Sequence, residues 1–142
     1  MLVYLDSVVC IYAIEGAAPF QIRARSRLAA IQDTGAQVAI SDLTWLECRV
    51  KPIRLDDRII LAAIEAFLTA SNVVRVGLTP AVYDKACRIR ALHKYRLADA
   101  LHLAAAIEGN CDLFLTNDHR LSRFTEIAVE VLDQGGENEV YR

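Results

Sequence analysis

The stretch LADALHLAAAIEGNCDLFLTND, residues 97–118, predicts a helix, a break and a strand in immediate succession. The alanine- and leucine-rich part, Ala98–Glu108, favours a helix that Gly109-Asn110 ends. The following apolar run, Asp112–Thr116, predicts a short strand that is buried on both faces. A helix that leads directly into a buried strand is typical of a domain in which helices cover a parallel sheet.

Strands and helices alternate over the rest of the chain as well. Further short apolar runs predict strands at Leu2–Leu5, Gln37–Ile40, Val73–Val76 and Ala128–Leu132. Helices are predicted at Val8–Ile14, Pro19–Thr34, Leu43–Val50, Asp56–Ala70 and Pro80–His93. Pro52 is expected to prevent the helix at Leu43–Val50 from continuing. This alternation predicts a three-layer α/β/α domain with a mostly parallel sheet of four to five strands.

Length and composition indicate one globular domain. With 142 residues the chain has the size of a single domain, expected to span residues 1–132, followed by a polar C-terminal tail at 133–142. Apolar residues make up 54% of the chain and charged residues 24%, which argues against a disordered protein. The formal net charge is −2, so overall charge does not indicate a nucleic-acid-binding protein.

The four cysteines are widely spaced and form no C-x-x-C pair. A zinc or redox motif is therefore not expected, and Cys10, Cys48, Cys87 and Cys111 are predicted to be small core residues in a reducing compartment. No apolar run approaches the roughly 20 residues of a membrane span. The N-terminal residues do not have the pattern of a secretory signal, so we expect a cytoplasmic protein without a membrane partner.

Four acidic residues lie where the predicted structure changes from one element to the next. Asp6 and Asp118 follow strands, Glu47 lies just after the second strand, and Asp99 is in the first turn of its helix. Ligands of parallel sheets bind beyond the carboxyl ends of the strands. We therefore expect the four acids to meet at one edge of the sheet.

A cluster of carboxylates without thiolates favours Mg²⁺ or Mn²⁺ over Zn²⁺. Such ions activate water and neutralise charge during phosphodiester cleavage. Each acid also has an ordinary structural explanation. Asp6 is in a position to cap a helix, Glu47 to lie on a solvated helix face, Asp99 to favour the helix dipole and Asp118 to form an Asx turn. These separate explanations do not account for all four acids falling at one edge.

Four segments resemble the motifs of PIN-domain nucleases, and the nearest branch is the VapC-type ribonuclease toxins of toxin–antitoxin pairs. The segments are Leu2–Ser7, Ser41–Glu47, Leu97–Ala106 and Asp112–Asp118, within a resemblance that covers about Leu2 to Leu132. The two later segments are the more specific. The chain departs from the pattern at Val8, where the family often has a small polar residue.

The resemblance implies the identity of the site residues and partners. Asp6, Glu47, Asp99 and Asp118 would bind Mg²⁺ or Mn²⁺ and activate water against an RNA phosphodiester, with Ser7, Thr116 and Asn117 supporting the acids. It also implies a homodimer and a cognate antitoxin of a type II system. The alternative is a PIN-like module that has lost activity and binds RNA or a protein without cleaving, for which Val8 is the only support.

Other residues are open to more than one interpretation. His102, three residues after Asp99, is expected to be a hydrogen-bonded histidine rather than a metal ligand. Several basic residues could line an RNA path or form solvated helix faces: Arg23, Arg25, Arg27, Arg49, Lys51, Arg54 and Arg58. The apolar helices near Val8–Ile14 and Ile59–Leu68 offer more apolar surface than a small core buries, which independently predicts a homodimer.

Overall fold

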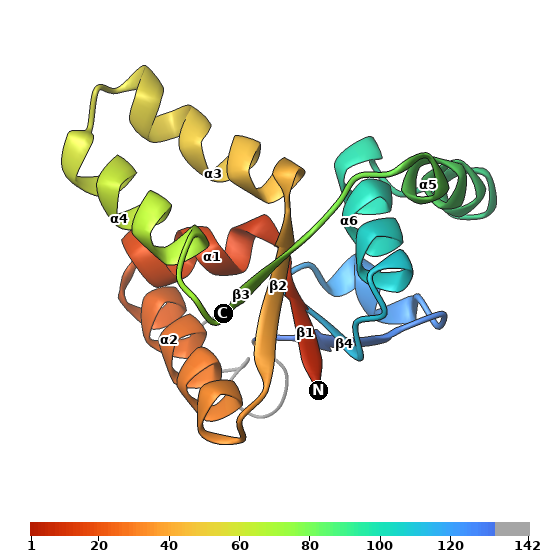
Figure 1. Ribbon diagram of the computed structural model, residues 1–142, viewed down its shortest axis with the longest axis horizontal. Helices are drawn as coiled ribbons and strands as arrows, with labels where there is room; N and C mark the ends of the chain where they lie inside the picture. Colours follow the sequence, from red (N-terminus) through yellow and green to blue (C-terminus); the bar gives the residue numbers. More distant parts are fainter. Residues whose placement is uncertain (133–142) are drawn as a thin grey trace.

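A five-stranded, entirely parallel sheet forms the centre of the protein in this computed structural model, which describes residues 1–132 (Figure 1). Its strands are β1 (Leu2–Leu5), β2 (Gln37–Ser41), β3 (Val73–Val76), β4 (Leu113–Thr116) and β5 (Ala128–Val131). They lie in the order β3-β2-β1-β4-β5. The predicted fifth strand and the parallel arrangement are thus confirmed.

Six α-helices and one short 3-10 helix connect the described strands. They are α1 (Ser7–Glu15), α2 (Ala18–Asp33), α3 (Asp42–Arg54), α4 (Arg58–Leu68), α5 (Pro80–Leu92), α6 (Leu97–Glu108) and η1 (His119–Arg123). Asp57 and Thr79 cap α4 and α5 through their side chains, as the capping preferences of Asp and Thr predict. Each predicted helix is present with bounds close to those expected.

The helices form two layers, one on each face of the sheet. Figure 1 shows α1 to α4 on one side and α5 and α6 on the other. Alternate residues of the central strand serve the two cores: Val3 and Leu5 pack in the cluster under α1 to α4, whereas Tyr4 packs against α5 and α6. The three-layer α/β/α architecture is therefore confirmed, and its physical basis is the two-residue periodicity of a strand.

The strand order reverses beside β1. From β1 the chain proceeds through β2 and β3 toward one edge of the sheet, and it returns through β4 and β5 to the other. Neighbouring connections on opposite faces leave a crevice at such a point, outside the carboxyl ends of the two strands. Asp6 directly follows β1, and Asp118 lies two residues beyond β4, so both acids are placed at this crevice.

Two sequence-based expectations about local structure are wrong. Helix α3 continues through Pro52 to Arg54. Proline removes only one donor there, close to the end of the helix, and its ring is buried, so packing offsets the loss. Cys10 and Cys48 are core residues, but Cys87 is exposed and Cys111 is half-buried. Cys87 follows Ala86, which is on the buried stripe of α5, and therefore points outward.

Two further points concern the ends and the surface. The predicted polar tail at 133–142 lies outside the described residues. Within residues 1–132, no helix has both the length and the apolar character that a membrane crossing requires. All four cysteines are free thiols, as the absence of a C-x-x-C pair suggested.

Candidate functional site

A cavity of about 730 Å³ opens at the carboxyl ends of β1 and β4, and all four predicted acids line it. Asp6 comes from the β1–α1 junction, Glu47 from α3, Asp99 from the first turn of α6, and Asp118 from the residues before η1. The predicted convergence of these four side chains on one edge of the sheet is observed. The cavity also contains Ser7 and Asn117, two of the three predicted supporting residues.

Asp6 is held by a side chain from the neighbouring strand. It occupies the N-cap position of α1, yet its side chain makes no capping hydrogen bond. Instead, the buried hydroxyl of Thr116 donates to Asp6 Oδ2 at 2.7 Å, and Thr116 Oγ1 accepts a bond from the backbone N–H of Asp118 at 3.1 Å. Thr116, the third predicted supporting residue, therefore links the two acids that follow β1 and β4.

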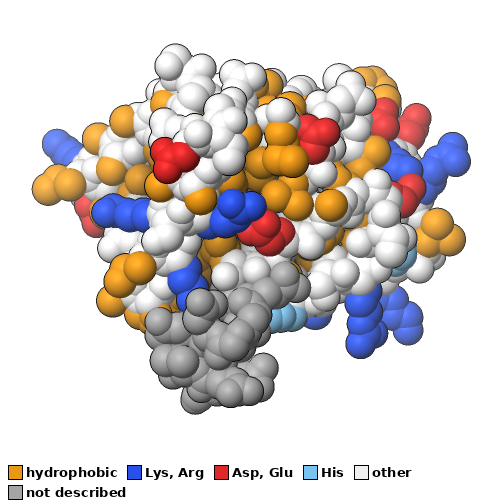
Figure 2. Space-filling view, turned by 90° about the horizontal axis from the view of Figure 1, so that it is seen from below, with side chains coloured by type: hydrophobic (Ala, Val, Ile, Leu, Met, Phe, Trp, Pro, Cys, Tyr) orange, Lys and Arg blue, Asp and Glu red, His pale blue; other side chains and the backbone are white. Residues whose placement is uncertain are grey.

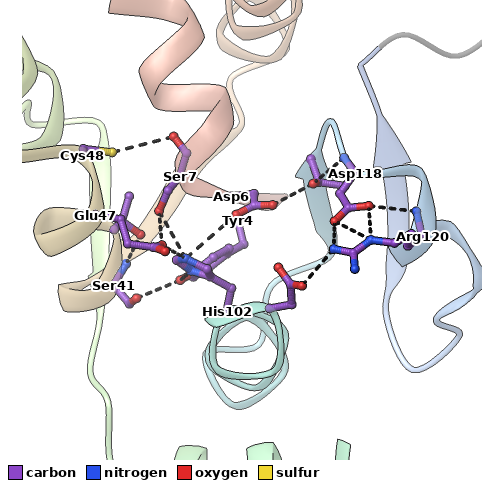
Figure 3. A network of polar contacts seen from close by, with 12 residues as sticks. Tyr4, Asp6, Ser7, Ser41, Glu47, Cys48, His102, Asp118 and Arg120 are labelled. Atoms are coloured by element: carbon purple, nitrogen blue, oxygen red, sulfur yellow. Dashed lines mark hydrogen bonds and ion pairs between the residues drawn. The ribbon is translucent and has the colours of Figure 1, made fainter. Parts of the chain in front are cut away.

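Glu47 is half-buried and is held by two other side chains (Figure 3). Ser7 Oγ donates to Glu47 Oε1 at 2.7 Å, and His102 Nε2 lies 2.6 Å from the same oxygen. Burial alone would raise the pKa of the Glu47 carboxyl, but the contacts with His102 and Ser7 together lower it below its ordinary value. Glu47 is thus a carboxylate, which only accepts hydrogen bonds, so the proton between it and His102 resides on Nε2.

His102 belongs to a buried polar network that continues away from the cavity. It is 1% exposed, and its Nδ1 lies 2.7 Å from the hydroxyl of Tyr4. The Tyr4 hydroxyl in turn donates to Ser41 Oγ at 2.8 Å. The expectation of a hydrogen-bonded histidine near the core is confirmed. Because each buried polar group has a partner, the network fixes the position of Glu47.

Asp99 and Asp118 are bridged by an arginine from η1. The guanidinium of Arg120 contacts Asp118 Oδ2 at 2.5 Å and Asp99 Oδ2 at 3.4 Å. The bidentate contact with Arg120 lowers the pKa of Asp118. The pKa of Asp99 is raised, first by burial and then by repulsion from Asp6 and Asp118, because its contact with Arg120 is too long to offset them.

The donor set fits a hard divalent cation. Among the side chains of residues 1–132, no three acidic, histidine or cysteine groups lie close enough together to hold one ion. Mg²⁺, however, commonly binds through one or two carboxylates and completes its shell with water and substrate phosphate. Asp99 and Asp118 already share one cation, the Arg120 guanidinium, which stands where a metal ion would neutralise the same pair. The side-chain oxygen of Asn117 is also buried without a hydrogen-bond partner in the described part of the chain.

Sequence reasoning missed several residues of the site. Arg120 and Arg96 line the cavity, although neither was among the basic residues proposed to line an RNA path. The helical spacing offered one usable signal, since Arg96 and Asp99 are three residues apart at the start of α6. The contact of Tyr4 with His102 has no local signal, because 98 residues separate the two.

The basic residues that were proposed do not line the cavity. Arg27 is paired with Glu130, and Arg49 with Glu65, so these two arginines support the fold. On the face shown in Figure 2, Lys and Arg side chains are spread among acidic and apolar ones rather than gathered over one element. Charge on the protein surface therefore gives no single stripe for a polyanion on this face.

The chain matches the model of the PIN domain family over residues 3–127. No curated protein sequence matches it. Among solved structures, the fold is similar to that of VapBC2 from Rickettsia felis bound to a DNA fragment from their promoter, with a TM-score of 0.76 and 18% identity over 92% of this chain and 98% of the other.

Two further solved structures share the fold. A toxin–antitoxin complex from Klebsiella pneumoniae has a TM-score of 0.73 and 20% identity, covering 92% of this chain and 97% of that one. VapC20 from Mycobacterium tuberculosis, a toxin that cleaves the Sarcin-Ricin loop, has a TM-score of 0.70 and 15% identity, covering 88% and 98%. At these identities the likeness concerns the fold.

Proposed function

The chain belongs to the PIN domain family, and on that premise we propose that it is a Mg²⁺- or Mn²⁺-dependent endoribonuclease, the toxin of a type II toxin–antitoxin pair. The observation that carries the proposal is the convergence of Asp6, Glu47, Asp99 and Asp118 on one cavity at the strand-order reversal. Structural cap or turn roles for the individual acids do not account for this convergence.

The residues of the cavity have distinct tasks in the proposed reaction. Asp99 and Asp118, with Asp6 beside them, would hold the ion, and Thr116 keeps Asp6 and the backbone of Asp118 in register. Glu47 is kept ionised and oriented by His102 and Ser7. When bound, the ion supplies activation of water and neutralisation of charge on the phosphate. The hydroxyl and imidazole groups act by positioning carboxylates and do not themselves reach the substrate.

Cleavage of a pool of structured RNAs tests the proposal. Purified protein, shown to be free of antitoxin, is incubated with Mg²⁺, with Mn²⁺ and with EDTA, beside the Asp99→Asn variant. We expect metal-dependent cuts that the variant does not make. If the wild-type protein binds RNA in this assay without cutting it, the module that binds without cleaving is the better reading, and Val8→Asn is the variant that asks whether a polar residue restores activity.

The proposed partners are an antitoxin and a second copy of the chain. Similar solved structures are toxin–antitoxin complexes, which supports the antitoxin. The end of the α3–α4 pair carries exposed apolar side chains, among them Ile53, Leu55 and Ile59, which supports a protein contact there. Size-exclusion chromatography with light scattering checks the homodimer, and a monomer at micromolar concentration would contradict it. Cytoplasmic localisation stays a prediction.

A further inference from the structure

A second hollow adjoins the acidic cavity and is basic. It has a volume of about 530 Å³ and is lined by His93, Lys94, Tyr95, His119, Arg120 and Arg123. Among these described residues none is acidic, and all but Tyr95 have a side chain that carries or can acquire a positive charge. We refer to these six residues as the basic hollow.

The basic hollow and the acidic cavity are continuous in space. His119 and Arg120 line both of them, so the two share a wall. The loop between α5 and α6 crosses the same boundary, because Arg96 lines the acidic cavity and Tyr95, the preceding residue, lines the basic hollow. The Tyr95 phenol is near enough to both sides for charges on each to act on its pKa. Burial raises that pKa, Arg123 opposes the rise and Asp118 adds to it.

Aromatic packing holds the two walls of the basic hollow together. The rings of His93 and Tyr95 are stacked, with centroids 5.1 Å apart and an interplanar angle of 7°. Both rings meet Phe124 edge-on, at 5.4 Å and 6.2 Å, and Phe124 is buried. The α5–α6 loop is therefore tied to the segment that follows β4, and the hollow has a fixed shape.

Cations of the basic hollow are available to a ligand. Within residues 1–132, Lys94 and Arg123 form no ion pair, whereas Arg120 is engaged with Asp99 and Asp118. Both Lys94 and Arg123 are exposed. Cations without acidic partners, placed beside half-buried aromatic rings, are the combination with which proteins bind single-stranded nucleic acid.

We propose that the basic hollow is an RNA subsite, in which Lys94 and Arg123 bind backbone phosphates next to the scissile one and the His93–Tyr95 stack supports the adjoining nucleotide. The proposal rests on the proposed nuclease function. RNA is favoured over an acidic protein because the hollow shares a wall with the acidic cavity, so a strand whose phosphate lies at the acids has to leave past His119 and Arg120.

Fluorescence anisotropy with a labelled single-stranded RNA of random sequence tests the subsite. All proteins carry Asp99→Asn so that the probe is not cut. The test variant is Lys94→Gln/Arg123→Gln, and the matched control is Arg88→Gln/Arg90→Gln, which removes the same charge from exposed positions on α5 outside the hollow. Melting temperatures establish that all variants fold.

We expect the test variant to bind the RNA more weakly and to lose about 1.4 from the slope of log K against log salt, about 0.7 for each of two phosphates on a single strand. The control should keep the wild-type slope. Equal losses in the two variants, or no loss in the test variant, would overturn the subsite. Poly-glutamate is the comparison ligand, and equal weakening of its binding would show a general anion surface and also overturn the proposal.

The cleavage assay separates the two proposals. If wild-type protein binds RNA through the hollow but cuts none with Mg²⁺ or Mn²⁺, the nuclease assignment fails and the subsite stands. If it cuts RNA while the test variant binds like the control, the nuclease stands and the subsite is wrong.

Discussion

The two sides of the acidic cavity hold their carboxylates by different means. On one side, Glu47 is bonded to His102, which is 1% exposed and belongs to a buried network. On the other, Asp99 and Asp118 share Arg120, whose side chain is 50% exposed. We call these the Glu47 side and the Arg120 side.

The difference indicates which part of the site is fixed and which can be exchanged. A buried hydrogen-bond network is costly to break, because each group left without a partner loses its solvation as well as its bond. An exposed ion pair is screened by solvent and contributes little. The Glu47 side therefore sets the geometry, and on the Arg120 side the guanidinium can give way to another cation.

The largest expected effect comes from removing a carboxylate on the exchangeable side. Asp118→Asn and Asp99→Asn should each lower RNA cleavage by more than the roughly 10–100-fold that is typical of residues that only support metal ligands. The melting temperature should change little, because the lost contact is an exposed ion pair. Single-turnover cleavage assays and thermal unfolding measure the two effects. Cleavage within a few-fold of wild type would remove these acids from the site.

Breaking the fixed side should affect stability as well as activity. His102→Ala leaves Tyr4 and Glu47 without their partners, and we expect a loss of about 3 kcal/mol in the free energy of unfolding. Cleavage should fall about 10–100-fold because Glu47 loses its orientation. Urea unfolding and cleavage assays provide the measurements.

Leu92→Ala is the control for His102→Ala, since it truncates a side chain that is 80% exposed. A loss of stability no larger than that of the control would mean that the network around His102 does not fix Glu47, and the contrast between the two sides would disappear.

The pH dependence of folding sharpens the comparison further. The pKa of Glu47 is lowered in the folded protein from an ordinary value of 4.5, so Glu47 stabilises the fold above that pH. This contribution is lost as the pH falls through the lowered pKa. The difference in unfolding free energy between wild type and Glu47→Gln should therefore shrink at acidic pH. Urea titrations across this range measure it, with the exposed Glu108→Gln as a reference. A difference that grows as the pH falls would contradict the assignment.

The smallest expected effect is that of the bridging arginine on stability. Arg120→Gln should leave the melting temperature in EDTA close to that of wild type, and it should tighten binding of Mn²⁺, since the guanidinium no longer competes for Asp99 and Asp118. Isothermal titration calorimetry measures the affinity. Arg58→Gln is the control, because Arg58 pairs with Asp56 on the surface away from the cavity. Weaker Mn²⁺ binding in Arg120→Gln than in the control would show that Arg120 helps to hold the ion.

Much of the fold and part of the site could be read from local patterns. Short apolar runs separated by helices predicted all five strands, because a buried strand needs a continuous apolar segment. The acids at the ends of these segments could be placed at one edge, because parallel strands end at the same edge. Pro52 misled the prediction of α3, since the burial of its ring depends on packing that no local pattern reports.

The sequence by itself determined the order of strands and helices and the positions of the four acids relative to them, because both depend on periodicities of a few residues. Only the tertiary structure decided how each acid is held. Glu47 meets His102 across 55 residues of chain, and Asp99 meets Arg120 across 21, so their hydrogen bonds and pKa values arise from packing between elements. The same holds for the basic hollow, whose cations come from two segments that Phe124 joins in space.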